Sequence, residues 1–95
     1  MLRRTMDAIL PPTLQLQLDD VLGNLRYARR TDDLGRLALL TYCEVRRWAR
    51  CAHQDSLAEQ ACELVARTPH RSRSEFLSLV DEVISELEQI RSSTH

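Results

Sequence analysis

Apolar side chains recur every three or four residues along most of the chain, which is the spacing of helices that bury one face. The first such segment follows Pro11 and Pro12, and Thr13 is its expected N-cap. Its apolar positions are Leu14, Leu18, Val21, Leu22, Leu25 and Ala28. Leucine and glutamine alternate over residues 14–18, which also fits a strand, and Gly23 marks either a helix break or a close backbone contact. We predict a helix, because the apolar residues of the whole segment recur every three or four residues.

A second helix is predicted from about Leu34 to Ala52, with Thr31 or Asp32 as its N-cap. Its expected buried stripe contains Leu34, Leu37, Ala38, Thr41, Val45, Trp48, Ala49 and Ala52. Residues 37–43 are apolar on almost every side, and a helix of that kind needs burial on every side. In so short a chain this predicts either a central helix or a helix at a subunit interface.

Two capping boxes predict where two further helices begin. Ser56 and Glu59 open a helix that runs to about Arg67. Ser72 and Glu75 open the last helix. The expected apolar faces are Leu57, Ala61, Leu64 and Val65 in the third helix, and Phe76, Leu77, Val80, Val83, Ile84, Leu87 and Ile90 in the last. The other side of the last helix is acidic, with Asp81, Glu82, Glu86 and Glu88.

Four such segments with short connections predict an all-α fold, a four-helix up-down bundle-like domain. We expect this domain over residues 13–91, after a short N-terminal arm at residues 1–12 and before a frayed tail at residues 92–95. The 95 residues include two Gly and three Pro, too few for the turns of β folds or for phosphate-binding loops. The apolar surface exceeds what four short helices need, so we expect a homodimer.

The basic residues are all arginines, and they are concentrated in the middle of the chain. The net charge is −1 at pH 7, but residues 26–53 carry seven Arg against three acids, and residues 54–95 carry four Arg against eight acids. Six arginines lie toward the ends of the first two helices: Arg26, Arg29, Arg30, Arg46, Arg47 and Arg50. There they complement helix dipoles and pair with acids, within the chain or across a dimer. The alternative is a patch that binds an acidic protein surface or a phosphate backbone.

The cysteines and histidines do not form a recognisable motif. The side-chain types that bind zinc occur at Cys43, Cys51, His53 and Cys62, but their spacing is that of no zinc site. We expect no metal and no cofactor, and we interpret the thiols as small buried or half-buried side chains. A catalytic dyad would need Cys43 or Cys51 beside His53 or His70, and a domain this small has little room for a pocket. We therefore do not expect an enzyme.

We expect neither a secretory signal nor a membrane-spanning helix. The apolar stretch from Ala8 to Leu10 is far shorter than the core of a secretory signal. No run approaches the roughly 20 apolar residues of a membrane span. With an odd number of cysteines, this predicts a cytoplasmic protein with reduced thiols and without a membrane partner.

Two short segments resemble parts of ribbon–helix–helix DNA-binding proteins. They are Leu16-Gln-Leu-Asp-Asp and Arg71-Ser-Arg-Ser-Glu-Phe-Leu. Proteins of that family have a short N-terminal strand, a helix and a second helix often opened by Arg-Ser-x-Ser-Glu. In this chain about fifty residues separate the two segments. The resemblance implies that residues 14–18 of two copies pair as a ribbon, with Gln15 and Gln17 facing the DNA groove.

These features predict a small non-enzymatic regulatory module that binds another protein through an apolar and arginine-rich helix surface. Besides the six arginines, that surface is expected to contain Leu39, Leu40, Tyr42 and Trp48. Trp beside Arg is typical of interface hot spots, although Trp48 is also in register with the core positions Val45 and Ala52. The alternative is a dimeric nucleic-acid-binding protein, similar to transcription regulators, that uses the basic patch from Arg26 to Arg50. A net charge near zero argues against it.

Overall fold

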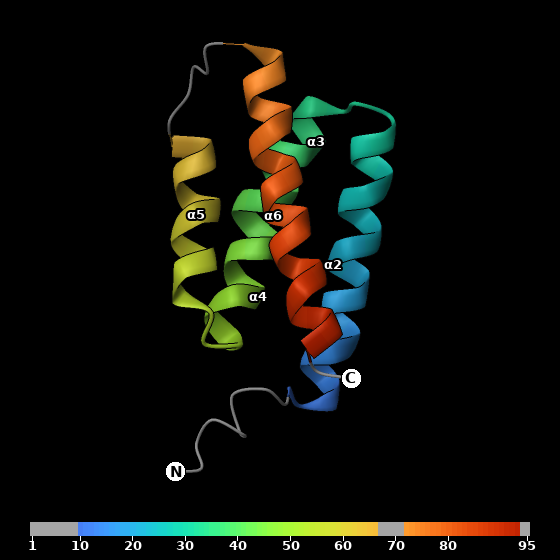
Figure 1. The fold of residues 1–95 in the computed structure, drawn as a ribbon, viewed down its shortest axis with the longest axis vertical. Coiled ribbons are helices and arrows are strands. Elements are labelled where there is room, and N and C mark those ends of the chain that lie inside the picture. Colours follow the sequence, from blue (N-terminus) through green and yellow to red (C-terminus); the bar gives the residue numbers. More distant parts are fainter. Residues whose placement is uncertain (1–9, 67–71, 94–95) are drawn as a thin grey trace.

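The computed structural model describes residues 10–66 and 72–93, and these residues form helices joined by short turns (Figure 1). The elements are α2 (Pro12–Arg30), α3 (Leu34–Leu39), η1 (Leu40–Val45), α4 (Arg46–Cys51), α5 (Asp55–Ala66) and α6 (Arg73–Ser93). Because α3, η1 and α4 follow one another without a break, they make one rod, and the described residues form four rods without a strand. The predicted all-α fold with four helices is confirmed. Predictions for residues 1–9, 67–71 and 94–95, and for the side chain of Val65, lie outside the described residues.

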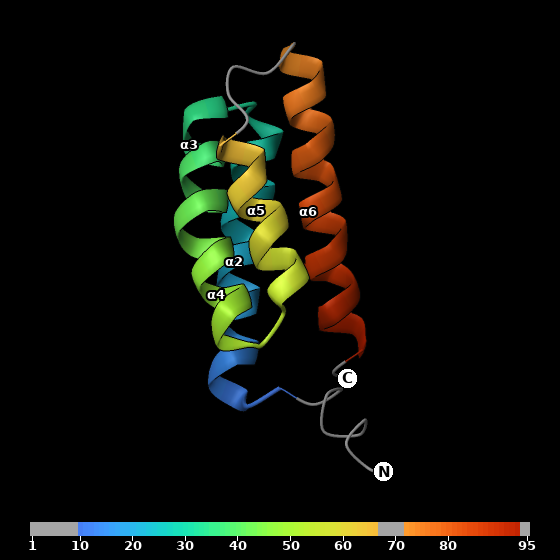
Figure 2. The ribbon, with the colours of Figure 1, turned by 90° about the vertical axis from the view of Figure 1, so that its left-hand side faces the viewer.

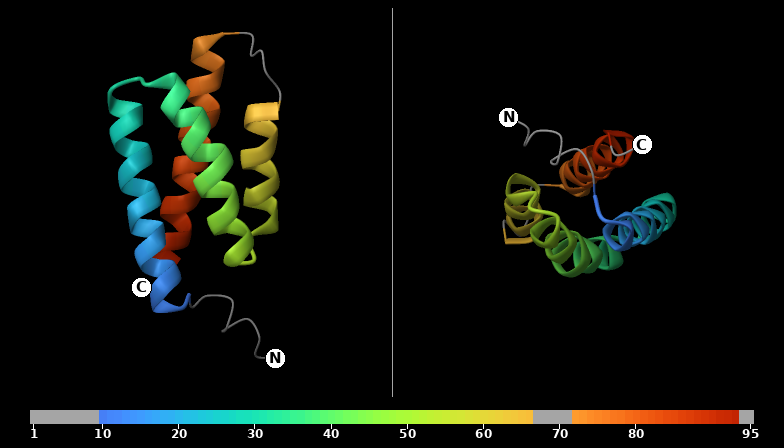
Figure 3. Two further views of the ribbon diagram at one scale, coloured as in Figure 1. Left: turned by 180° about the vertical axis from the view of Figure 1, so that it is seen from behind. Right: turned by 90° about the horizontal axis from the view of Figure 1, so that it is seen from below.

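Successive rods run in opposite directions along the long axis of a compact molecule of 44 by 22 by 18 Å (Figures 1 and 2). Seen along that axis, α6 lies across the molecule from the rod of α3, η1 and α4, with α2 and α5 between them on either side (Figure 3). Each helix therefore packs beside its neighbours in the sequence, and α6 also packs against α2. None of the described helices combines the length and apolarity needed to cross a lipid bilayer.

The first helix, α2, begins one residue earlier than its expected cap. Pro11 is the cap residue, and Pro12 and Thr13 lie in the first turn. Proline is tolerated at position 12 because no backbone N–H is needed in the first turn. Residues 14–18 are helical, so the ribbon implied by the DNA-binding resemblance is wrong. The Gln15 side chain donates a hydrogen bond to the Leu10 carbonyl oxygen at 2.7 Å, so it is occupied within its own chain. The predicted apolar positions of α2 are buried at Leu18, Val21, Leu22, Leu25 and Ala28.

Gly23 neither breaks α2 nor permits a close contact. The helix continues through it, and a Cβ atom at this position would have no neighbour within 4 Å. We expect Gly23→Ala to raise the free energy of unfolding by about 1 kcal/mol, because alanine has the higher helix propensity and its methyl group meets open space. Urea denaturation followed by circular dichroism measures this change. A lower urea midpoint in the variant would contradict an open environment at position 23.

The turn between α2 and α3 differs from the sequence prediction. Asp33, rather than Thr31 or Asp32, caps α3, and its side chain accepts a hydrogen bond from the Arg36 N–H at 3.2 Å. The Thr31 hydroxyl instead donates to carbonyl oxygens in the last turn of α2. Asp32 adopts a left-handed conformation with φ of 52°. Both predicted caps are therefore wrong, because the chain uses these residues to end α2 before it begins α3.

The rod predicted as one regular helix contains a π-helical segment, η1. The Arg46 N–H donates to the Thr41 carbonyl oxygen, five residues earlier. A π turn holds about one residue more than an α turn, so the residues after η1 lag by about 100° behind an uninterrupted helix. This shift turns the later buried residues of the rod toward the side of Leu40, which belongs to the same core as Leu37 and Val45. In a regular helix, Leu40 would lie about 120° from the centre of the predicted stripe.

The two predicted capping boxes have different outcomes. The helix α5 begins at Asp55, so Ser56 lies inside its first turn and is not the cap. At the start of α6, the Ser72 hydroxyl oxygen accepts a hydrogen bond from the Glu75 N–H at 3.0 Å, as predicted. The apolar stripe of α6 is buried at Phe76, Val80, Val83 and Leu87 and partly buried at Leu77, Ile84 and Ile90. In the third helix, Leu57, Ala61 and Leu64 are buried.

Candidate functional site

The arginines at the end of α2 are occupied by acids of α6. Arg26 Nη2 lies 2.6 Å from Glu88 Oε2, and Arg29 Nε lies 2.8 Å from Asp81 Oδ1. Arg29 also contacts Asp32 at 2.8 Å. The pKa of Arg29 is raised, chiefly by its hydrogen bond to Asp81. The pairing of arginines with acids of the C-terminal half is therefore observed at this helix end, and it removes two of the six arginines from a free basic patch.

Further polar contacts continue along the edge between α2 and α6. Arg91 Nε lies 2.6 Å from Asp19 Oδ1 in the first half of α2. Arg30, the third arginine at the end of α2, has a different environment. Its guanidinium carbon lies 5.8 Å from the centroid of the Tyr27 ring, at the outer limit of a cation–π contact. No carboxylate pairs with Arg30 among the residues that the structure describes.

Two residues expected at the binding surface lie in the core. Leu40 is 7% exposed and Trp48 is 3% exposed. The indole Nε1 of Trp48 donates a hydrogen bond to the Leu14 carbonyl oxygen at 2.9 Å, which gives the buried ring the polar partner it needs. The core position predicted from the register of Trp48 is confirmed. Its side chain fixes α4 against the first turn of α2 and is almost wholly buried.

The other five expected residues lie on the outward side of the rod of α3, η1 and α4. Together with an exposed cysteine they form a surface that we call the arginine face: Leu39, Tyr42, Cys43, Arg46, Arg47 and Arg50. All of them are exposed except Arg46, which is half-buried, whereas Leu40, Thr41, Val45, Trp48 and Ala49 of the same rod are buried. Leu39 is 62% exposed and Tyr42 is 40% exposed. The expectation that residues 37–43 are buried on every side is therefore wrong for a single chain.

The apolar and cationic parts of the arginine face are in contact. The Arg46 guanidinium carbon lies 4.3 Å from the centroid of the Tyr42 ring, a cation–π distance, and Arg46 Nε donates to the Tyr42 carbonyl oxygen at 3.3 Å. Within the described ranges, no carboxylate pairs with Arg46, Arg47 or Arg50. The helix α6, whose Asp81 and Glu88 pair with arginines of α2, lies across the molecule from this rod (Figure 3). The arginines of α4 therefore remain available to another molecule.

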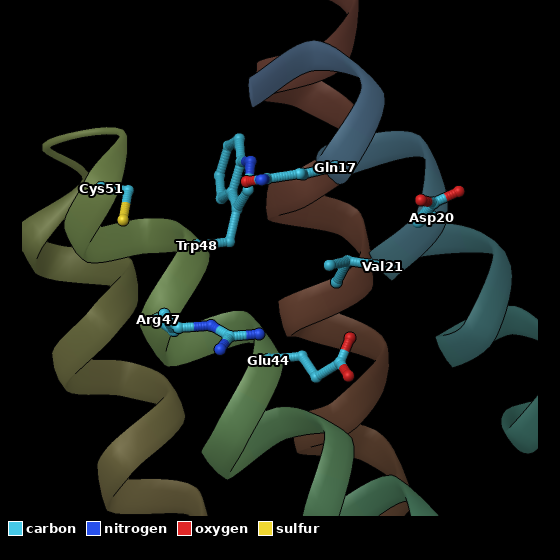
Figure 4. Close-up of a pocket in the computed structure, with 7 residues that line it drawn as sticks. All are labelled: Gln17, Asp20, Val21, Glu44, Arg47, Trp48 and Cys51. Atoms are coloured by element: carbon cyan, nitrogen blue, oxygen red, sulfur yellow. The ribbon is translucent and has the colours of Figure 1, made fainter. Parts of the chain in front are cut away.

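A groove of about 490 Å³ lies between α2 and α4, beside the arginine face (Figure 4). It is lined by Gln17, Asp20, Val21, Glu44, Arg47, Trp48 and Cys51. The Arg47 and Glu44 side chains extend side by side from one wall, and Gln17 reaches from α2 toward Trp48 (Figure 4). Because Arg47 belongs to both features, the groove extends the arginine face with further hydrogen-bond donors and acceptors.

The cysteine and histidine side chains are scattered over several elements. Cys43 and Cys51 are exposed, and Cys62 is partly buried. The interpretation of Cys43 and Cys51 as buried or half-buried is wrong, because η1 and the end of α4 turn them outward. His53 lies in the turn after α4, and His70 lies outside the described residues. In the described part of the chain, no three His, Cys, Asp or Glu side chains are placed to hold a metal ion.

No protein-family model, curated protein or solved structure matches this chain.

The sequence pattern predicted every member of the arginine face except Cys43, for which it suggested only metal binding or nucleophilic catalysis. The signal that places Cys43 there is its distance of four residues from Leu39 and from Arg47.

Proposed function

We propose that this chain is a small non-enzymatic module that binds another protein through the arginine face. The observation that carries the proposal is a set of three arginines that pair with no carboxylate of the described residues and that lie on the same rod as the exposed Leu39 and Tyr42. Tyrosine and arginine are enriched in protein interfaces, and complementary charge determines which partner is selected. The partner that fits is an acidic protein surface with an apolar strip.

We further propose that the four rods, which alternate in direction, form an up-down bundle-like domain. In this proposal the module acts as a regulator in the cytoplasm and needs no cofactor. The exposed apolar side chains on one face favour association with another chain, and the homodimer is one such association. Neither Leu39 nor Tyr42 belongs to the buried core of the single chain, so both side chains are left to contact another chain.

A phosphate backbone is the alternative partner for the same arginines. Two observations favour a protein. Arg26 and Arg29 are paired with acids of α6, so two of the six arginines of the predicted basic patch are not free to bind phosphate. The apolar side chains of Leu39 and Tyr42 continue the surface, and apolar side chains gain nothing from phosphate groups.

We expect Arg47→Glu to weaken binding of an acidic amphipathic peptide, built from Glu and Leu at helical spacing, by about tenfold. The reason is that Arg47 is an exposed member of the arginine face and also lines the groove. Fluorescence anisotropy of the labelled peptide, at low and at physiological salt, measures the change. Arg30→Glu is the matched control, because it changes the net charge equally at a site outside the face.

The same titration with a mixed-sequence DNA duplex decides between the two partners. Micromolar duplex binding that falls by orders of magnitude with salt and is lost in Arg47→Glu would establish the alternative. Equal peptide binding by the Arg47→Glu and Arg30→Glu variants would contradict the proposed function. Circular dichroism of both variants checks that the helices are retained.

A further inference from the structure

An acidic groove runs between α5 and α6. It contains two hollows of about 290 and 80 Å³, which share Gln60 and Glu82. The larger hollow is also lined by Ser85, Glu86 and Gln89, and the smaller one by Leu64 and Leu79 among others. Glu82 and Glu86 are exposed, and no cation pairs with either one among the described residues. By contrast, Asp81 and Glu88 on the same helix form ion pairs with arginines of α2.

The arginine face and the acidic groove complement each other. Glu82 and Glu86 are four residues apart on α6, and Arg46 and Arg50 are four residues apart on α4. In helices this spacing places side chains about 5–6 Å apart on one side, so the two pairs of charges match when the helices lie alongside. The partly buried Leu79 gives the groove an apolar portion, as Leu39 and Tyr42 give one to the face. In a contact between them, the convex arginine face would fill the concave acidic groove, which has the opposite charge.

One copy of the chain cannot satisfy both surfaces by itself. The rod that carries the arginine face lies across the molecule from α6, which forms one wall of the groove (Figure 3). Arg46, Arg47 and Arg50 therefore lie on a different side of one molecule from Glu82 and Glu86. Only a second molecule brings them together.

We propose that the arginine face binds the α5–α6 groove of a second copy of this chain. This inference rests on the proposed function, because it assigns a partner to the same face. Since the two surfaces differ and lie on different sides, the contact is heterologous: each copy uses its face on one neighbour and its groove on another. The homodimer is the first step, and association continues with concentration. A foreign acidic partner competes with the groove for the same arginines.

The test is sedimentation equilibrium of the full chain and of two neutralised variants. The face variant carries Arg46→Gln, Arg47→Gln and Arg50→Gln. The groove variant carries Glu82→Gln and Glu86→Gln. We expect the mass of the wild-type protein to rise from 11.0 kDa with concentration and to fall back with salt. Each variant alone should associate at least tenfold more weakly.

Mixing the two variants gives the decisive result. The face variant keeps an intact groove and the groove variant keeps an intact face, so an equimolar mixture should form a one-to-one dimer that does not grow further. Glu59→Gln is a matched control, because Glu59 is an exposed acid of α5 outside the hollows, and it should associate like the wild type. Variants that dimerise alone as strongly as the wild type would overturn the heterologous contact.

The failure of this inference is distinguishable from failure of the proposed function. A wild-type chain that stays monomeric at every concentration and salt excludes a second copy as the partner. If Arg47→Glu still weakens peptide binding in that case, the arginine face binds a different acidic protein. If it does not, both proposals are wrong.

Discussion

Deletion of Cys43 should leave the fold intact, whereas deletion of Asn24 should unfold the chain. Both residues are exposed, so the difference lies in the helices around them. The segment η1 holds one residue more than a regular helix, and removing one exposed residue from it restores α-helical geometry while both flanks keep their buried sides. Removing Asn24 from the regular helix α2 turns Leu25 and Ala28 by about 100° relative to Leu18, away from the core.

Urea denaturation followed by circular dichroism measures both deletions. We expect the variant without Cys43 to stay within about 1 kcal/mol of the wild type, the typical effect of a surface change. The variant without Asn24 displaces two buried side chains, at about 2–5 kcal/mol for a large one, in a domain whose total stability is about 5–15 kcal/mol. Equal destabilisation by the two deletions would show that η1 is not an insertion into an otherwise regular rod.

Replacement of Trp48 should cause the largest loss from a single substitution. We expect Trp48→Ala to lower the free energy of unfolding by about 3–5 kcal/mol, because it leaves a cavity where α4 packs on α2. Trp48→Phe keeps most of the ring but loses the hydrogen bond to the Leu14 carbonyl oxygen, for a loss of about 1–2 kcal/mol. Circular dichroism is the suitable probe, since Trp48 is the only tryptophan.

Tyr42→Ala is the control for Trp48→Ala on the same rod. Tyr42 is 40% exposed and belongs to the arginine face, so its removal should change stability by less than about 1 kcal/mol. It should weaken association through that face instead. A loss of stability for Tyr42→Ala as large as for Trp48→Ala would contradict the assignment of Trp48 to the core and Tyr42 to the surface.

The helices could be predicted from the sequence because burial dictates the period of apolar residues. In α2, Leu18, Val21, Leu22, Leu25 and Ala28 repeat at that period and are buried. The ends of the helices were harder to predict. Thr31, Asp32 and Asp33 have nearly the same capping chemistry, and the backbone path through the left-handed Asp32 decides which of them caps α3. Ser72 is followed three residues later by Glu75, which completes a capping box that the nearby Ser74 lacks, and it caps α6 as predicted.

The π segment could not be predicted, because the stripe from Leu34 to Ala52 fits a regular helix equally well. The extra residue is visible only in the folded chain, in the hydrogen bond from the Arg46 N–H to the Thr41 carbonyl oxygen and in the burial of Leu40. The same limit applies to the arginines. Sequence spacing alone does not distinguish Arg26 from Arg46, since the presence of a carboxylate nearby depends on where α6 lies. For this reason the sequence predicted one basic patch, and the structure divides it into a paired and an unpaired part.

The ion pairs between α2 and α6 have a consequence for synthesis of the chain on the ribosome. Arg29, Arg26 and Asp19 pair with residues 52, 62 and 72 positions later. At a translation rate of about 5–20 residues per second, α2 waits about 3–14 s for these partners. During that time its apolar side has only the second rod to pack against. We expect the nascent chain to be a chaperone client until α6 has emerged from the exit tunnel.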